Sequence, residues 1–103
     1  MNIAARFGEN LRRCRERADV SQEELGIRAS LHRTQIGSLE RGGHLPRIDT
    51  LVKLAGALSV SPLDLLDGIV WQPGSATVGG FEPIPDSAET GAQAGRRAPT
   101  RSA

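Results

Sequence analysis

The sequence predicts an all-α domain of five short helices, followed by a non-helical arm and a polar tail. Apolar residues recur at three- and four-residue steps in residues 3–18 and 48–58, and helix-capping residues divide the segment between them. The composition then changes, because residues 69–103 hold nine Pro and Gly among 35 and show little periodicity. The helical domain is therefore expected to end at Gly68.

A first helix is predicted over residues 3–18, because one stripe of it is apolar. The members of this stripe are Ile3, Phe7, Leu11, Cys14 and Ala18. Cys14 is the only cysteine of the chain, which excludes an internal disulfide and a zinc site built from four cysteines. We expect the Cys14 thiol to fill a small gap in the core as an apolar group.

Residues 20–42 are expected to form two short helices joined by a tight turn. Ser21 precedes the first of them, and its hydroxyl can cap the helix while Glu24 reaches back to the Ser21 amide, which is the pattern of a capping box. Only Ser30–His32 remain for the turn. A connection this short makes the two helices cross at a steep angle, as in a helix-turn-helix motif.

The second of these helices is predicted over residues 33–41. It begins after His32 and ends at Gly42, where a left-handed residue can close it. Ile36 and Leu39 are expected to point into the core. The residues left on the outer, exposed face are Arg33, Thr34, Gly37, Ser38 and Arg41.

Two further helices complete the predicted domain. The fourth spans about residues 48–58, with an apolar stripe directed inward. Its members are Ile48, Leu51, Leu54, Ala55 and Leu58. The fifth is short, with Ser61 as its cap, Pro62 at its first position and Asp64 at its third.

Length and charge limit the functions that are compatible with the chain. A sequence of 103 residues has room for one small domain, which buries only about 60% of its unfolded surface, so self-association would stabilise it. Thirteen Lys and Arg oppose twelve Asp and Glu, a net charge of +1, so any surface that binds nucleic acid must be local. No uncharged apolar stretch approaches the roughly 18 residues of a membrane span. The single cysteine and the lack of an export signal favour the cytoplasm.

The chain is predicted to divide into a helical domain (residues 1–68), an arm (residues 69–84) and a disordered tail (residues 85–103). The arm contains Val70, Trp71 and Phe81 close to Pro-Gly and Gly-Gly pairs, which is sufficient for two short strands. Two interpretations of these apolar residues remain open. The arm packs on the fourth and fifth helices, or it joins two copies of the chain through its aromatic side chains.

Several spaced motifs resemble one known family. The run SQEEL begins at Ser21, LERG occupies residues 39–42, Pro46 follows, and TLVKLAGALSVSPLDLL occupies residues 50–66. Over about residues 4–68 the chain resembles the Cro/C1-type (XRE) helix-turn-helix domain of bacterial and phage regulators. The resemblance implies a five-helix, lambda repressor-like fold and a protein that binds double-stranded DNA to regulate transcription.

Two residues depart from the pattern of that family. Ser30 occupies a turn position where the family usually has Gly, and a left-handed Ser30 would cost roughly 1–2 kcal/mol. Gly26 stands where the family usually packs Ala, which weakens its helix by about 1 kcal/mol. We therefore expect the turn to be tilted or slightly strained.

The resemblance places three residues, Arg33, Thr34 and Ser38, at positions that usually contact bases. Arg33 lies in the first turn of the predicted recognition helix, and its guanidinium matches guanine O6 and N7 in the major groove. Thr34 can contact a thymine methyl or a phosphate, and Ser38 can donate or accept a hydrogen bond. The alternative for each is an ordinary solvated helix residue.

A second set of side chains is expected to contact phosphates, which position a protein on DNA without specifying sequence. It comprises Gln22, His32, Arg41, His44 and Arg47. The resemblance also implies an ion pair between Arg15 and Glu40 that braces the first helix against the recognition helix. A metal-binding role for His32 or His44 is not expected, because no cluster of ligands accompanies them.

The leading hypothesis is a sequence-specific transcriptional regulator that binds an inverted-repeat operator as a homodimer, at the nucleoid. The alternative is a protein-interaction module, such as an antitoxin whose residues 69–103 bind a partner protein. Restriction-modification controllers and phage repressors are similar small regulators, and the sequence does not separate them. An enzyme is not expected, and neither is a cofactor, because the chain lacks a phosphate-binding loop, a metal-ligand cluster and a nucleophile-base pair.

Overall fold

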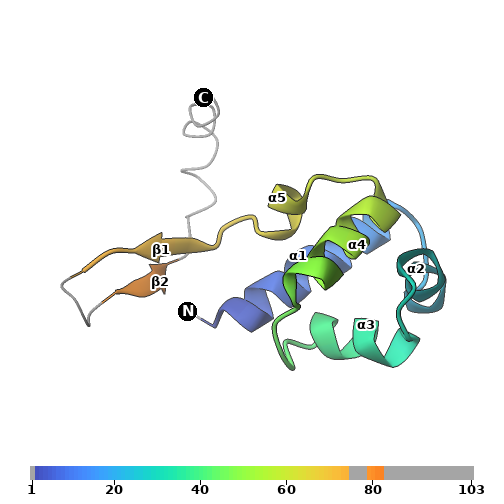
Figure 1. The fold of residues 1–103 in the computed structure, drawn as a ribbon, viewed down its shortest axis with the longest axis horizontal. Helices are drawn as coiled ribbons and strands as arrows, with labels where there is room; N and C mark the ends of the chain where they lie inside the picture. The colour runs from blue at the N-terminus through green and yellow to red at the C-terminus, as the bar shows by residue number, and fades with distance from the viewer. Residues whose placement is uncertain (1, 75–78, 83–103) are drawn as a thin grey trace. The chain divides into compact units, whose positions relative to one another are not determined.

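Five helices follow one another in the computed structural model, which describes residues 2–74 and 79–82 (Figure 1). They are α1 (Ile3–Arg17), α2 (Gln22–Ala29), α3 (Arg33–Glu40), α4 (Ile48–Leu58) and α5 (Pro62–Leu65). Together they belong to one compact unit, Asn2–Asp67. The all-α prediction is confirmed, and the predicted recognition helix differs by one residue, because Arg41 caps α3 instead of extending it. None of the helices in the described part of the chain has the length and apolar character that a bilayer span requires.

Local caps determine where the helices begin. The Ser21 hydroxyl accepts a hydrogen bond of 2.9 Å from the Glu24 amide, as predicted. The reciprocal half of that capping box does not form, because the Glu24 carboxylate accepts instead from Arg28 Nε, one helical turn further on, at 2.9 Å. At α5 the box is complete. The Asp64 carboxylate accepts from the Ser61 amide at 3.0 Å, and the Ser61 hydroxyl accepts from the Leu63 amide at 3.1 Å.

The turn between α2 and α3 explains both departures from the family pattern. Ser30 has a φ of 59° and is left-handed, so the strained arrangement is the one observed. Beside it, the Leu31 amide donates to the Gly26 carbonyl at 2.8 Å. A Cβ at Gly26 would lie 2.6 Å from the Leu31 carbonyl oxygen, so the turn passes too close to α2 for an alanine there. Glycine at position 26 is the residue that this tight turn accommodates.

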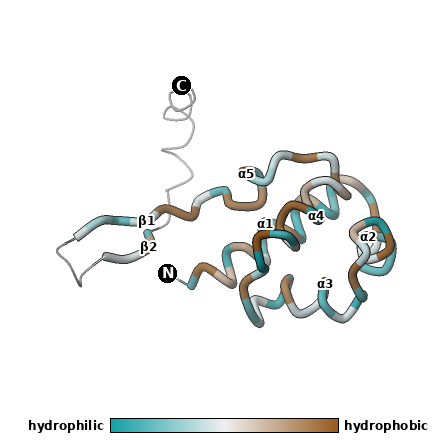
Figure 2. The backbone as a smooth tube through the Cα atoms, in the orientation of Figure 1, coloured by the Kyte–Doolittle hydropathy of each residue, from teal (hydrophilic) through white to brown (hydrophobic). Residues whose placement is uncertain are grey.

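The core lies where the helices meet: α3 packs against α1 and α2, α4 packs against α2 and α5, and α5 packs against α1. Its apolar members are Phe7, Leu11, Cys14, Leu25, Ala29, Ile36, Leu39, Leu51, Leu54, Ala55, Leu58 and Leu65. Figure 2 shows hydrophobic positions recurring between hydrophilic ones along the helices. Two predicted core residues are wrong. Ala18 is exposed at the cap of α1, and Ile48 is 76% exposed because it occupies the first turn of α4, ahead of its buried stripe.

One polar side chain, Asn10, is fully buried in this core. Its amide nitrogen donates to the carbonyl oxygens of Leu65 at 3.0 Å and Asp67 at 2.9 Å. Its amide oxygen accepts from Arg13 Nη2 at 2.6 Å. Because all three bonds are made, burial of Asn10 is compensated and the backbone after α5 is tied to α1.

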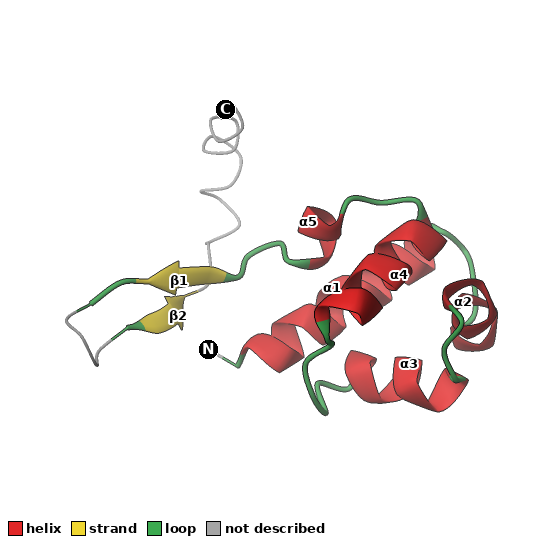
Figure 3. Ribbon diagram, viewed as in Figure 1, coloured by secondary structure: helices red, strands yellow, loops and turns green. Residues whose placement is uncertain are grey.

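The arm forms the two short strands that were predicted, β1 (Val70–Gln72) and β2 (Gly80–Glu82), drawn yellow in Figure 3. They pair antiparallel, with Trp71 opposite Phe81. The two rings meet edge to face, with centroids 5.2 Å apart and planes at 74°. A Cβ at Gly79 would collide with the Trp71 ring, so the glycine makes room for it. The predicted disordered tail, residues 85–103, lies outside the described residues.

Candidate nucleic-acid interface

The two sides of α3 differ sharply in exposure. Ile36 and Leu39 are 0% and 1% exposed, and they hold the helix in the core of the helical unit. Arg33 and Thr34 are exposed on the opposite side, and Ser38 is half-buried. The helical unit therefore presents a polar helix face to its surroundings, with donors and acceptors of the kind that contact base edges.

Gly8 of α1 allows a close approach between α1 and α3. A Cβ there would lie 2.5 Å from the carbonyl oxygen of Leu39 and 2.6 Å from that of Glu40. Both are backbone atoms, so neither can move aside without shifting α3. The absence of a side chain at Gly8 therefore sets how α3 rests on α1. The sequence analysis missed this residue, since nothing in the local pattern of α1 distinguishes it.

Glu40 is the centre of a charged cluster on the buried side of α3, with a side chain 0% exposed. Arg15 donates two hydrogen bonds to the Glu40 carboxylate, from Nε to Oε2 at 2.6 Å and from Nη2 to Oε1 at 3.0 Å. The remaining guanidinium nitrogen of Arg15 donates to the Val20 carbonyl at 2.9 Å. Arg12 adds a third arginine nitrogen 3.5 Å from Oε1. This cluster joins α1 to the C-terminal end of α3.

The charge state of the cluster follows from these contacts. Burial alone would raise the pKa of the Glu40 carboxyl. Hydrogen bonds from Arg15 and Gln22, together with the charges of Arg15 and Arg12, outweigh burial and leave this pKa below its ordinary value. The hydrogen bond to Glu40 in turn raises the pKa of the Arg15 guanidinium. Both groups therefore remain charged, and the pair is held by charge-assisted hydrogen bonds.

Gln22, predicted to contact a phosphate, also touches this cluster. Its Nε2 donates to Glu40 Oε1 at 3.1 Å, which uses one of the two N–H donors of the carboxamide. The side chain also lines a shallow cleft of about 270 Å³ at the start of α2. The other residues around this cleft are Arg15, Ser21, Glu23 and Arg33. Arg15 is already bound to Glu40, so Arg33 is the cation in this lining that remains available to a ligand.

Gly37 was predicted to lie on the exposed face of α3, and this prediction is wrong, because the residue is buried. A Cβ at this position would lie 3.1 Å from Arg41 Nη1 and 3.6 Å from Gln22 Oε1. Arg41 and Gln22 therefore lie across the outer surface of α3 at this point. Glycine here leaves space for two of the predicted phosphate-contacting side chains.

The C-terminal end of α3 closes in a Schellman motif. Gly42 has a φ of +75°, its amide donates to the Leu39 carbonyl at 3.0 Å, and the Gly43 amide donates to the Ser38 carbonyl at 2.9 Å. The closed turn brings His44 back to the helix, where its Nδ1 lies 3.1 Å from Ser38 Oγ. This contact between two predicted DNA-facing residues was not foreseen from the sequence.

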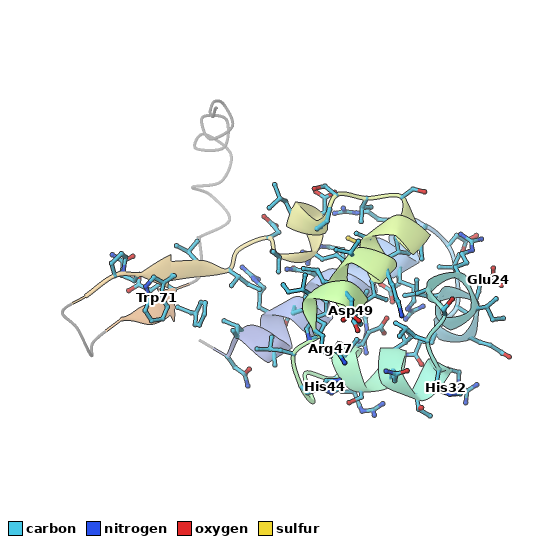
Figure 4. The ribbon with its side chains drawn as sticks, viewed as in Figure 1. Glu24, His32, His44, Arg47, Asp49 and Trp71 are labelled. Atoms are coloured by element: carbon cyan, nitrogen blue, oxygen red, sulfur yellow. The ribbon has the colours of Figure 1, made fainter. Side chains whose placement is uncertain are left out.

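The remaining predicted residues lie at the two ends of α3 (Figure 4). His32 is exposed at the start of the helix, whereas His44 and Arg47 lie beyond its other end. Arg47 Nε is 3.4 Å from Asp49 Oδ1, and its side chain is 85% exposed.

Trp71 and Phe81 contact each other within the strand pair. Among the residues that the structure describes, no group of three His, Cys, Asp or Glu side chains could hold a metal.

Comparison with known proteins assigns the helical unit to one family. The sequence model of the family described as a helix-turn-helix domain matches residues 6–67 of this chain. The control protein C.BamHI of Bacillus amyloliquefaciens is 42% identical over 67 residues, which cover 64% of this chain and 83% of that protein.

Two solved structures show the same fold. The restriction-modification controller protein C.AhdI of Aeromonas hydrophila superposes with a TM-score of 0.59 at 35% identity, covering 60% of this chain and 94% of its own. The P22 c2 repressor protein in complex with a synthetic operator superposes with a TM-score of 0.57 at 32% identity, over the same shares. The five-helix, lambda repressor-like fold expected from the motifs is thereby confirmed.

Proposed function

Since this chain belongs to the Cro/C1-type helix-turn-helix family of DNA-binding transcriptional regulators, we propose that it binds an inverted-repeat DNA operator as a homodimer through α3. The observation that carries the proposal is the arrangement of α3. Its apolar side is buried at Ile36 and Leu39, its C-terminal end is braced by Glu40, and its polar side is open. A rigid helix with one free polar face is what entry into a major groove requires.

The proposal divides the polar residues into two groups. Arg33, Thr34 and Ser38 contact base edges, because they share the open side of α3. The side chains around the helix ends contact the backbone phosphates of the duplex. These are Gln22, His32, Arg41, His44 and Arg47. Among them, Arg41 and Arg47 supply locally the positive charge that a net charge of only +1 does not provide over the whole chain.

We propose a dimer for two reasons, the small size of the helical unit and the exposed aromatic side chains of the arm. A helical unit of this length buries a small core, and an operator with two half-sites needs two recognition helices about 34–36 Å apart. Trp71 and Phe81 are 55% and 38% exposed, and together with Val70 they offer an apolar contact for a second copy. Trp71→Ala is expected to shift the protein toward the monomer in analytical ultracentrifugation, whereas an unchanged dimer would assign the contact elsewhere.

Within this family the comparisons favour one class of regulator. C.BamHI and C.AhdI, at 42% and 35% identity, are more similar in sequence to this chain than the P22 c2 repressor at 32%, and C.AhdI is described as a restriction-modification controller. We propose that this chain controls a restriction-modification system from the cytoplasm. No relative reported above is named for a catalytic activity, in agreement with the expected non-enzymatic regulator. Neighbouring genes for an endonuclease and a methyltransferase, with the operator upstream, would support the assignment.

The test is selection of bound sequences from a random duplex pool with the wild type and Arg33→Ala. The wild type should recover a palindrome, and the variant should lose preference at one position of each half-site. The loss of a bidentate contact corresponds to roughly 1–3 kcal/mol of discrimination. Affinity should also fall steeply with salt concentration.

Arg17→Ala is the matched control, because it removes the same charge from an exposed position of α1 outside the proposed contacts. This variant should recover the wild-type palindrome. Failure of the wild-type protein to enrich any sequence would overturn the proposed function. Enrichment of the same sequence by Arg33→Ala would remove Arg33 from the base-contacting group.

A further inference from the structure

His44 and Ser38 form a side-chain pair at the C-terminal end of α3. Nδ1 of His44 lies 3.1 Å from Oγ of Ser38, six residues away along the chain. Ser38 is half-buried and His44 is exposed, so both have a side open to a bound duplex. The pair exists because Gly42 turns the chain back through its left-handed conformation.

The Ser38 hydroxyl occupies the space that a side chain at position 43 would need. A Cβ at Gly43 would lie 2.7 Å from Ser38 Oγ and 3.1 Å from the Ser38 carbonyl oxygen. The Gly43 amide also donates to that carbonyl at 2.9 Å. Any residue other than glycine at position 43 would displace the Ser38 hydroxyl, so the loop is shaped around this group.

We propose that His44 determines which bases Ser38 accepts, by setting the direction of the hydrogen bond between them; this rests on the proposed function of α3. A hydroxyl has one proton and two lone pairs. Neutral His44 in its Nε2–H tautomer accepts at Nδ1, so the Ser38 proton is committed and only lone pairs face the groove. Ser38 then accepts from a base donor, the exocyclic amine of adenine or cytosine.

Protonation of His44 reverses the bond. The imidazolium carries a proton on Nδ1 and donates it to Ser38 Oγ, which frees the serine proton for a base acceptor. The acceptors in the major groove are O6 and N7 of guanine, N7 of adenine and O4 of thymine. The base preference at this one position therefore follows the protonation state of His44.

The charged groups on the segments that flank His44 are Arg41, at the cap of α3, and Arg47 with its partner Asp49, at the start of α4. No ion pair to His44 is formed within residues 2–74 and 79–82. The hydrogen bond to Ser38 is therefore the interaction that distinguishes His44 from an ordinary phosphate-contacting histidine. His32, at the other end of α3, lacks such a serine partner in the described structure and provides the comparison.

The experiment measures Kd for duplexes that carry each of the four base pairs at the position where Ser38→Ala relaxes the selected sequence, at pH 5.5 and pH 8. The wild type should prefer an amine donor at pH 8 and lose this preference at pH 5.5, by about three- to tenfold, the worth of one hydrogen bond. His44→Asn does not titrate, and its base preference should be the same at both pH values. In the Ser38→Ala background, His44→Asn should leave the base preference unaltered.

His32→Asn is the control, because it removes the other histidine beside α3. It should weaken binding to all four duplexes alike and retain the pH-dependent preference. If His44→Asn behaves in the same way, His44 contacts only phosphate and the inference is overturned, while the proposed function stands. If the wild type binds no duplex specifically, the proposed function fails instead.

A measurement without DNA tests the same bond. In the free protein, Ser38→Ala should shift the ¹⁵N resonance of His44 Nδ1, whereas Thr34→Ala, on the same helix, should leave it in place. An Nδ1 resonance that is the same in Ser38→Ala and in the wild type would overturn the inference whatever the outcome with DNA.

Discussion

The two sides of α3 use charge in opposite ways. On the inner side, Glu40 is fully buried and its carboxylate is held by Arg15, Arg12 and Gln22. On the outer side, Arg33 and Arg41 are exposed. The inner charges are paired and stabilise one helix orientation, whereas the outer charges remain available to a ligand. A recognition surface needs a rigid support, and in this domain the support is itself polar.

The largest effect is expected from breaking the inner cluster. Glu40→Gln leaves Arg15, whose side chain is only 14% exposed, without its charged partner. Removal of one member of a buried ion pair costs about 3–5 kcal/mol, a large fraction of the stability of a small domain. Chemical denaturation would measure the loss. Glu9→Gln is the control, since the Glu9 side chain is 67% exposed and its ion pair with Arg6 is 3.8 Å long, and it should cost under about 1 kcal/mol.

The same cluster predicts an acid dependence. The pKa of Glu40 is lower in the folded protein than its ordinary value of 4.5, so the cluster stabilises the fold fully above about pH 4.5. This stabilisation is lost as the pH falls through the lowered pKa, because the unfolded chain then binds a proton more readily. The free energies of unfolding of the wild type and Glu40→Gln should converge as the pH falls below 4.5. Parallel curves down to pH 2 would contradict the assignment.

The second effect concerns the contact between α1 and α3. Gly8→Ala places a methyl group against the backbone of Leu39 and Glu40 and should cost about 1–3 kcal/mol. Because α3 must shift, operator affinity should fall as well. Gly56→Ala is the matched control in α4, where nothing lies within 4 Å of the new Cβ, and it should stabilise the protein by about 0.5–1 kcal/mol. Thermal unfolding would measure the stability of both variants. Equal gains in stability for Gly8→Ala and Gly56→Ala would refute the close approach at Gly8.

The smallest effect is expected at the turn. Ser30→Gly removes the cost of a left-handed serine and should stabilise the protein by about 0.5–1 kcal/mol, after the added flexibility of the unfolded chain is subtracted. Ser59, with a φ of 57°, has the same conformation after α4, so Ser59→Gly should give a similar gain in the same denaturation experiment. A gain at Ser59 alone would show that the Ser30 hydroxyl contributes to the turn.

Local signals were enough to place the helices. Ser21, Ser61 with Pro62, and Gly42 act within four residues of themselves, so their roles follow from short stretches of sequence. The strand pair was predictable in the same way, from apolar residues beside Pro-Gly and Gly-Gly. The motifs between residues 21 and 66 also predicted the family, because their spacing records the turns that join the helices.

Contacts between residues far apart in the sequence were harder to predict from it. The burial of Asn10, the space that Gly8 leaves for α3 and the contact of Gln22 with Glu40 each depend on how helices cross, and no residue within a helical turn reveals it. Ile48 was misplaced for the same reason. Its spacing fits the apolar stripe of α4, but its side chain is 76% exposed in the first turn of that helix.

The helices and the motif followed from the sequence alone, because caps and hydrophobic spacing are local properties of the chain, whereas the DNA-contacting residues stay a prediction. The tertiary structure decided how α3 is held, which glycines allow close packing, and that Ser38 is paired with His44. Those outcomes depend on distances between atoms that only packing brings together. The burial of Glu40 and the close approach at Gly8 each depend on two helices, so neither can be predicted from the sequence of one helix alone.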